Sequence, residues 1–134
     1  GTSSQWKSVC KMIYPLAVRA VEEKNIKIID RLASVGFIDV GNDDGNSLLH
    51  IAALLGHDEV ISHLLTGFPL DVNIKNHENQ TALHFASQCG EIRCILLFLD
   101  YWAVIDATDT REQTALFKAA ERGHFEAVQL LALR

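Results

Sequence analysis

The chain has 134 residues, 49% of them hydrophobic and 22% charged, which fits one globular domain and argues against a disordered chain. The net charge of −5 is uneven: residues 1–31 hold six Lys and Arg against three Asp and Glu (+3), and residues 32–134 hold six against fourteen (−8). An acidic body of this kind repels phosphates, so we expect no nucleic-acid binding and favour a partner with a basic or neutral protein surface.

Residues 1–13 read as a linker followed by an amphipathic segment. A helical spacing of i, i+3, i+4 and i+7 is carried by Trp6, Val9, Cys10 and Ile13. Ser3 or Ser4 is a suitable N-cap for this segment. We therefore expect a capping helix over 5–13 that covers the open face of the first unit; the alternative is an unstructured polar start.

Residues 14–41 contain a weak helix-turn-helix pattern. A first helix is predicted over 16–25, with Lys24 at the position where later units have a glycine. An apolar stripe then continues at Ile28, Ile29 and Leu32. The spacing to the next unit differs by one residue between the two ends of this helix, so its exact register stays open.

Three later segments repeat one another at a nearly constant step. The segment 47–53 (SLLHIAA) returns at 81–87 (TALHFAS) and at 114–120 (TALFKAA). A glycine keeps the same step, at Gly56, Gly90 and Gly123. Self-similarity with a period of about 33 residues is typical of a stacked helical repeat.

Each of these segments has the same local signals. A Ser or Thr stands at the N-cap position, and the glycine ends the first helix with a left-handed backbone. The second helix has an apolar stripe, as at Ile92, Cys94, Ile95, Phe98 and Leu99. Short side chains allow neighbouring helix pairs to approach closely, at Ala52, Ala86 and Ala119.

These residues resemble the ankyrin repeat, whose signature Thr-Pro-Leu-His-x-Ala-Ala-x-x-Gly-His reads SLLHIAALLGH over 47–57. The resemblance covers about residues 14–134. It implies an all-α solenoid of about four helix-turn-helix units with β-turn fingers, in which the short first helices line the concave side. The expected units are 14–41, 42–75, 76–108 and 109–134.

The histidines do not form a metal-binding pattern. They are His50, His57, His63, His77, His84 and His124. His57 and His63 are six residues apart, which is not the spacing of two ligands on one helical face. The resemblance implies instead that His50 and His84 hydrogen-bond the neighbouring turn. Phe117 replaces this histidine in the last unit, so that turn must be held differently.

The cysteines and the remaining motifs give no sign of catalysis. Cys10, Cys89 and Cys94 have no CxxC spacing and are expected to be reduced thiols, with Cys89 and Cys94 packed as small hydrophobic residues. No phosphate-binding loop, dinucleotide-binding fingerprint or serine-hydrolase motif is present. We therefore expect no enzyme activity, no metal and no cofactor.

The resemblance also indicates which residues face the groove. They are the residue after the signature histidine position and the two before the glycine: Ile51, Leu54, Leu55, Phe85, Gln88, Cys89, Lys118, Glu121 and Arg122. We expect a hydrophobic pocket near Ile51, Leu54 and Phe85, flanked by the charges of Lys118, Glu121 and Arg122. The alternative, held open for Ile51 and Leu55 in particular, is that such residues face the adjacent repeat as core.

Protruding polar turns are a second set of candidate binding residues. The finger tips carry Asp43, Asp44, His77, Glu78, Arg111 and Glu112. Trp102 stands where the family usually has glycine. It either plugs a crevice between loops, which we favour, or is an exposed anchor for a partner.

One modification signal lies in the second unit. Asn73 follows Leu65 by eight residues within the tripeptide 71–73, which resembles the turn motif that asparaginyl hydroxylases modify in ankyrin repeats. A structural role in the turn is the favoured interpretation.

The sequence thus predicts a non-enzymatic module that binds a protein or peptide through its concave groove and finger tips. The alternative is a regulatory or substrate-targeting ankyrin domain of a larger enzyme, ubiquitin-ligase adaptor or channel. The sequence stops in the middle of a predicted helix, so we expect a fragment of a longer protein. Reduced cysteines and the lack of a membrane-spanning run favour a monomeric intracellular domain, cytoplasmic or nuclear, without membrane insertion.

Overall fold

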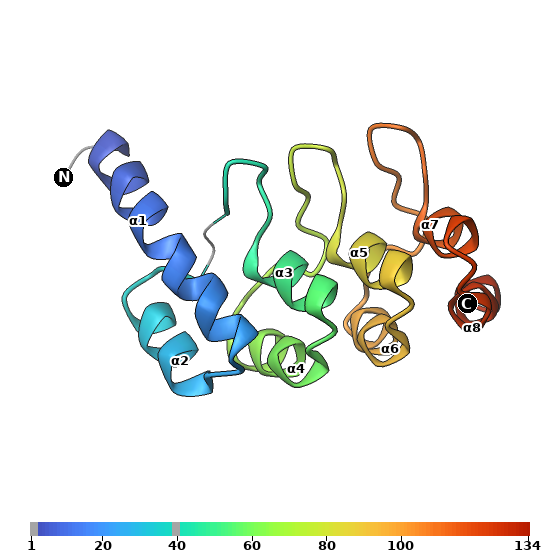
Figure 1. Cartoon of the computed structure of the whole chain (residues 1–134), viewed down its shortest axis with the longest axis horizontal. Helices are drawn as coiled ribbons and strands as arrows, with labels where there is room; N and C mark the ends of the chain where they lie inside the picture. Colours follow the sequence, from blue (N-terminus) through green and yellow to red (C-terminus); the bar gives the residue numbers. More distant parts are fainter. Residues whose placement is uncertain (1–2, 39–40) are drawn as a thin grey trace.

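The computed structural model describes residues 3–38 and 41–134, apart from the side chains of Ser3, Ser4, Trp6 and Lys7. Its helices form four successive pairs that stack in chain order, with three loops projecting from one side of the stack (Figure 1). Within these ranges the only β pairing is an isolated bridge between Gly41 and Ser47. The helices are α1 (Ser3–Glu22), α2 (Ile26–Ser34), α3 (Leu48–Leu55), α4 (Asp58–Gly67), α5 (Ala82–Cys89), α6 (Ile92–Asp100), α7 (Ala115–Glu121) and α8 (Phe125–Ala132). The expected all-α solenoid of paired helices is confirmed.

The first helix is longer than the sequence pattern predicts. Residues 5–13 do not form a separate capping helix, because α1 runs unbroken through Pro15 to Glu22. Its buried face continues across the proline at Tyr14 and Ala17, while Pro15 itself is exposed and lacks the backbone N–H that a residue in a helix interior donates. The predicted N-cap (Ser3 or Ser4) and the apolar Trp6 lie outside the described side chains.

The predicted helix ends are confirmed. The side-chain oxygens of Ser47, Thr81 and Thr114 each accept the backbone N–H three residues further on. Gly90 ends α5 with φ 70°, in the left-handed region that glycine adopts without strain. Lys24 adopts the same kind of backbone, with φ 55°, at the place predicted for it in the first unit.

Short side chains let neighbouring pairs pack closely. Ala52, Ala86 and Ala119 are fully buried, and α3 packs beside α5, which packs beside α7. Ile61 and Ile95 on the second helices of their pairs are fully buried as well. One apolar core therefore runs through the whole stack, as the nearest-neighbour stabilisation of a solenoid requires.

The three loops that project from the stack, here called the fingers (41–46, 75–80 and 108–113), are joined to one another. The backbone N–H of His77 donates to the carbonyl oxygen of Asp44 at 2.8 Å, and that of Thr110 donates to Glu78 at 3.0 Å. These two bonds fix the spacing of the fingers relative to one another.

Candidate functional site

Two positions near the end of each inner helix recur along the stack. Because α3, α5 and α7 pack side by side in equivalent poses, equivalent residues form a row along one face. We call this the inner-helix row; its members are Leu54, Leu55, Gln88, Cys89, Glu121 and Arg122. Its character changes from apolar in α3, through mixed in α5, to charged at the end of α7.

The apolar end of the row is partly open to solvent. Leu54 is 49% exposed and Leu55 is 40% exposed, so the alternative that Leu55 is a core residue does not hold. Ile51 and Phe85 are half-buried and pack against the core. The ring of Phe85 also meets the imidazole of His50 edge-on, with 5.2 Å between centroids. Ile51 and Phe85 are thus held by the core, whereas Leu54 and Leu55 are open to solvent.

The middle of the row is tied to the apolar end. The Cys89 thiol lies 3.8 Å from the carbonyl oxygen of Leu54, so that α5 and α3 touch on this face. Burial, with a smaller contribution from Glu91, raises the pKa of Cys89 and disfavours its thiolate. Gln88 beside it is half-buried. A protonated thiol is a poor nucleophile, so this residue fits packing better than chemistry.

Lys118 does not supply charge to the groove, contrary to the sequence-based expectation. Its ammonium lies 3.0 Å from a carboxylate oxygen of Asp109 and 2.7 Å from the side-chain oxygen of Gln113. Both partners of the ion pair are buried, with side-chain exposures of 9% and 3%. The long side chain of Lys118 therefore turns inward and neutralises the buried carboxylate of Asp109. Of the three charged residues predicted to face the groove, only Glu121 and Arg122 are exposed.

The electrostatics of Asp109 follow from that arrangement. Burial by itself raises the pKa of this carboxyl, but hydrogen bonds from the Gln113 amide, the Lys118 ammonium and the Arg111 amide outweigh it and hold the pKa below its usual value. Asp109 is therefore an ionised anchor for the third finger, held by the backbone on one side and by Lys118 on the other.

The signature histidines join successive units. His50 and His84 are buried; their Nδ1 atoms accept the N–H of Ser47 and Thr81, so Nε2 carries the proton and donates to the next finger. The acceptors are the carbonyl oxygens of Gln80 at 2.7 Å and Gln113 at 3.0 Å. Burial is the main cause that lowers the pKa of both histidines, which keeps them neutral. Their predicted structural role is confirmed.

Sequence reasoning missed a residue with the same role in the first unit. The Tyr14 hydroxyl donates to the carbonyl oxygen of Asn46, which directly precedes the N-cap Ser47, just as Gln80 precedes Thr81. The signal was a tyrosine close to the place of the signature histidine in a unit that lacks one. Burial, and then the charge of Asp44, raises the pKa of this tyrosine to about 12.

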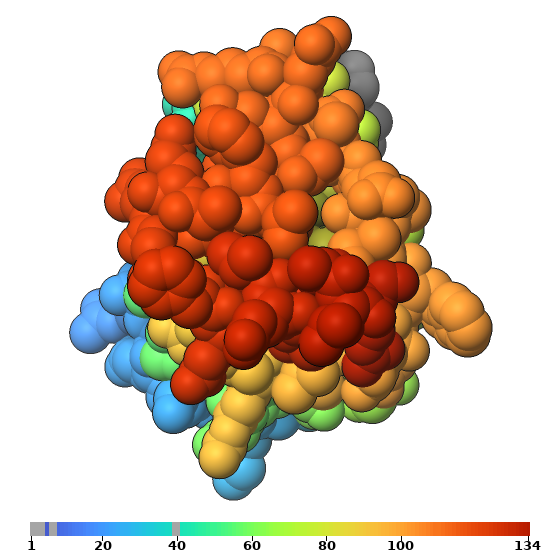
Figure 2. Space-filling model, turned by 90° about the vertical axis from the view of Figure 1, so that its right-hand side faces the viewer, coloured from blue at the N-terminus to red at the C-terminus, as the bar shows by residue number. Residues whose placement is uncertain are grey.

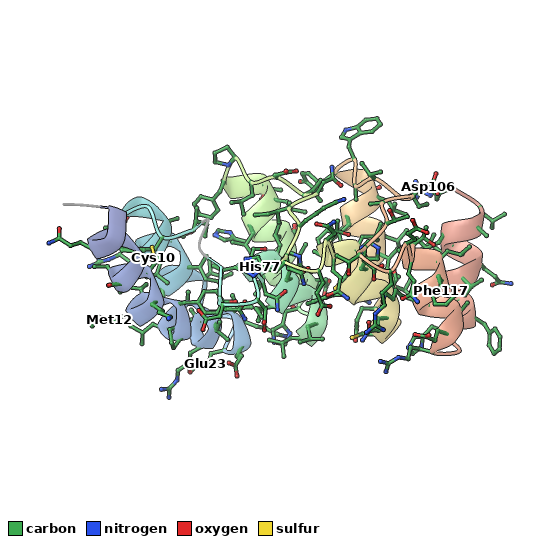
Figure 3. All side chains as sticks on the ribbon, turned by 90° about the horizontal axis from the view of Figure 1, so that it is seen from above. Cys10, Met12, Glu23, His77, Asp106 and Phe117 are labelled. Carbon is green, nitrogen blue, oxygen red and sulfur yellow. The ribbon has the colours of Figure 1, made fainter. Side chains whose placement is uncertain are left out.

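The predicted finger residues His77, Glu78 and Arg111 are all exposed. Figure 3 shows the stack from the finger side, with His77 between Met12 at the α1 end and Phe117 at the α7 end. Trp102 is 86% exposed, so it does not plug a crevice, and the favoured interpretation of this residue is wrong. The alternative of an exposed anchor remains.

Asn73 connects the second and third units. Its side-chain oxygen accepts the backbone N–H of Val104 at 2.8 Å, and its own N–H donates to the side chain of Asp71 at 2.8 Å. The residue is half-buried. These bonds agree with the favoured structural role of Asn73 in the turn.

A comparison with known protein families agrees with the stacked helix pairs and their connecting bonds. The family model described as ankyrin repeats (3 copies) matches residues 61–134, and a model of the single ankyrin repeat matches 44–77. The chain belongs to the ankyrin repeat family. Ankyrin repeats are protein-interaction modules, and the family is generally non-catalytic.

Relatives place such repeats inside much longer proteins. The chain is 29% identical over 118 residues (86% of this chain) to the tyrosine-protein kinase Shark of Drosophila melanogaster. It is 38% identical over 87 residues (64%) to the E3 ubiquitin-protein ligase XBAT32 of Arabidopsis thaliana, and 34% identical over 93 residues (66%) to the nuclear factor NF-kappa-B p105 subunit of Mus musculus. It spans only 12%, 17% and 10% of their respective lengths.

Two further observations concern residues 3–38 and 41–134 alone. None of their helices is long and apolar enough to cross a membrane. Nowhere in these ranges do three His, Cys, Asp or Glu side chains gather as a bound metal ion would require.

Proposed function

We propose that this domain binds a protein or peptide segment through the inner-helix row and the adjoining finger tips. The observation that carries the proposal is the pair of exposed leucines, Leu54 and Leu55, on a helix that is otherwise packed. Such side chains gain free energy when a partner covers them. The scaffold beneath them is held by histidine and finger bonds, so little conformational entropy is lost on docking.

The charged residues at the α7 end of the row would determine in which orientation a partner segment binds. Glu121 and Arg122 are exposed beyond the mixed middle of the row, and Arg111, His77 and Glu78 project from the fingers. A segment with an apolar anchor for Leu54 and polar residues toward Glu121 and Arg122 fits this order. The net charge of −5 favours a partner that is basic or neutral, and no nucleic acid.

The experiment is a quantitative pull-down with three forms of the domain: wild type, Leu54→Asp and Val35→Asp. Val35 is 61% exposed at the C-terminal end of α2, outside the inner helices that carry the row, so its replacement is a matched control. The proposal requires a binding protein that is lost with Leu54→Asp and retained with Val35→Asp. Retention with both variants, measured on folded protein, would contradict it.

A second candidate is a targeting or regulatory role within a larger enzyme or adaptor, with catalysis outside this domain. Two relatives favour this candidate, a tyrosine-protein kinase and an E3 ubiquitin-protein ligase. The chain matches only 12% and 17% of their lengths, so most of each relative lies outside the matched repeats. In this role the domain acts as a monomer at a cytoplasmic or nuclear location and needs no cofactor. Sequencing of the transcript on both sides of the region would test it directly.

Asn73 is proposed as an additional substrate position for an asparaginyl hydroxylase. Its loop would have to open for the oxygenase to reach it, because the side chain is held by Val104. Incubation with such a hydroxylase, its 2-oxoglutarate co-substrate and iron should add the mass of one oxygen to the wild type and none to Asn73→Gln. An unchanged wild-type mass would remove the proposal.

A further inference from the structure

Trp102 combines two features that are unusual together. Its side chain is 86% exposed, so the protein itself buries very little of a large apolar group. Its backbone φ is 69°, in the left-handed region that bulky residues rarely adopt. A strained backbone at an exposed aromatic residue is an observation that calls for a functional explanation.

The turn that follows α6 imposes this backbone. The N–H of Trp102 donates to the carbonyl oxygen of Leu99 at 3.1 Å, and that of Ala103 donates to Phe98 at 2.9 Å. These are the two bonds of a Schellman motif, whose left-handed position is usually a glycine. Trp102 occupies that position.

The first unit contains the same turn with the usual residue. After α2, the N–H of Gly36 donates to Ala33 at 3.0 Å and that of Phe37 donates to Leu32 at 2.9 Å, and Gly36 has φ 89°. The fold thus makes this turn with glycine elsewhere in the same chain. Nothing in the turn itself requires a tryptophan.

The loop that carries Trp102 is fixed on both sides. The Schellman bonds hold it to α6, and the bond from Val104 to the Asn73 side chain holds it to the preceding unit. Val104 is also exposed, at 53%. In Figure 2 the segment that follows α6 stands out from the right-hand edge of the molecule. A large aromatic group on a rigid loop is preorganised for docking.

A hollow of about 560 Å³ lies between α4 and α6, next to this loop. Its lining includes Asp58, Glu59, Arg93, Leu96, Leu97 and Asp100. Leu96 and Leu97 are half-buried, and three carboxylates stand against one guanidinium. Asp100 is the last residue of α6 and precedes Trp102 by only two residues, so the hollow extends to the start of the loop. Within the described part of the chain these three carboxylates form no ion pair.

We propose that Trp102 and this hollow form a second docking surface, separate from the inner-helix row, for a basic amphipathic segment of another protein. The charge of the hollow selects the occupant, since Lys and Arg complement its carboxylates. An Arg side chain of the segment would pair with the Asp100 carboxylate, and another cation would stack on the exposed indole of Trp102. Apolar side chains of the segment then cover Leu96 and Leu97.

The test uses two synthetic probes and the full 134-residue chain. One peptide alternates Arg with Leu, and the other has Glu in place of every Arg. Binding is followed by two-dimensional ¹⁵N NMR, in which the indole signal of Trp102 is identified by its disappearance in Trp102→Gly. We expect the basic peptide to shift that indole signal together with the amides of Ser62 and Asp100, and the acidic peptide to shift none of them.

Three variants locate the site. Trp102→Gly should weaken binding of the basic peptide at least tenfold, and Asp100→Asn should weaken it several-fold. Phe125→Ser, which removes an exposed aromatic side chain from α8, should leave it unchanged. Leu54→Asp should also leave it unchanged, so the result is independent of the function proposed for the inner-helix row.

A thermal melt separates a docking role from a structural one. Glycine relieves the left-handed backbone, so Trp102→Gly should melt at the same temperature as the wild type or higher. A melt several degrees lower would show that Trp102 supports the fold and would overturn the proposal. Equal binding of both peptides, no binding of the basic one, or binding unaffected by Trp102→Gly would overturn it as well.

Discussion

The hydroxyl of Tyr14 and the carbonyl oxygen of Asn46 form a 2.8 Å hydrogen bond across 32 residues of sequence. His50 and His84 make the equivalent bonds to Gln80 and Gln113 in the next two units. Each acceptor is the residue directly before an N-cap. A phenol in the first unit therefore replaces the imidazole of the repeat signature, with a side chain that reaches from α1 to the first finger.

Replacing Tyr14 with Phe should destabilise the domain by about 1 kcal/mol, because the carbonyl of Asn46 loses a partly buried donor. Urea unfolding measured by circular dichroism gives this value. Tyr101→Phe is a matched control, since the Tyr101 hydroxyl makes no hydrogen bond to the described residues. Equal stability of the Tyr14→Phe variant and the wild type would show that the bond contributes nothing.

The same residue gives a pH dependence in alkali. Its pKa is raised from 10.0 to about 12, so the unfolded chain releases this proton before the folded one does. The stability contributed by Tyr14 is complete below pH 10.0 and is lost as the pH rises from 10.0 toward about 12. The loss should be smaller in Tyr14→Phe than in the wild type, when both are compared by urea unfolding across this window.

Lys118→Met should lower the free energy of unfolding by about 3 kcal/mol, because it leaves the Asp109 carboxylate buried without its cation. Arg122→Met, four residues later and exposed, should have almost no effect. In the wild type, the stability that the ionised Asp109 contributes is fully present above pH 3.8, the ordinary pKa of this carboxyl. It is lost as the pH falls through the lower pKa that the carboxyl has in the folded state. A similar cost for both variants would refute the special role of the buried pair.

Acid should weaken the histidine links. The pKa values of His50 and His84 are lowered from 6.5 in the folded state, so the unfolded chain binds more protons below that pH. Their stabilisation is complete above pH 6.5 and is lost as the pH falls through the folded pKa values. The double variant His50→Gln with His84→Gln should flatten this dependence in urea unfolding, whereas His77→Gln on a finger tip should not. An unchanged slope in the double variant would contradict the assignment.

Lys24→Gly should stabilise the domain by about 1 kcal/mol, since Lys24 has φ 55° at the place where the next units have glycine. The change is measured as the urea midpoint. Lys27→Gly within α2 is the opposite case and should destabilise by about 1 kcal/mol. A loss of stability in Lys24→Gly would mean that the lysine side chain makes a contribution larger than its backbone strain.

Local signals explain why much of the fold was predictable. Ser47, Thr81 and Gly90 act through bonds to residues within four positions, so their roles follow from short sequence patterns. The period of about 33 residues then indicates how the units stack. The exposed Leu54 was also expected, because its position in the unit fixes the direction of its side chain.

The predictions that failed depend on contacts that the repeat pattern does not contain. Lys118 resembles a surface charge until Asp109, nine residues earlier, is found buried beside it. The unbroken α1 follows from the buried face that continues on both sides of Pro15, which a local rule for proline does not include. Trp102 was expected to be covered because it is large and apolar, yet the Schellman turn holds it in solvent.

The donor bonds from Tyr14, His50 and His84 all run toward the following unit, so the stack has a polarity. Detaching α7 and α8 with their finger brings the His84 imidazole into water, where it takes up a proton readily. Detaching α1 and α2 releases the Tyr14 phenol, which remains neutral, and leaves the bonds of His50 and His84 to the following fingers in place. Mild acid should therefore unfold the domain from the α8 end, and the opposite end should hold until the remaining pairs come apart together.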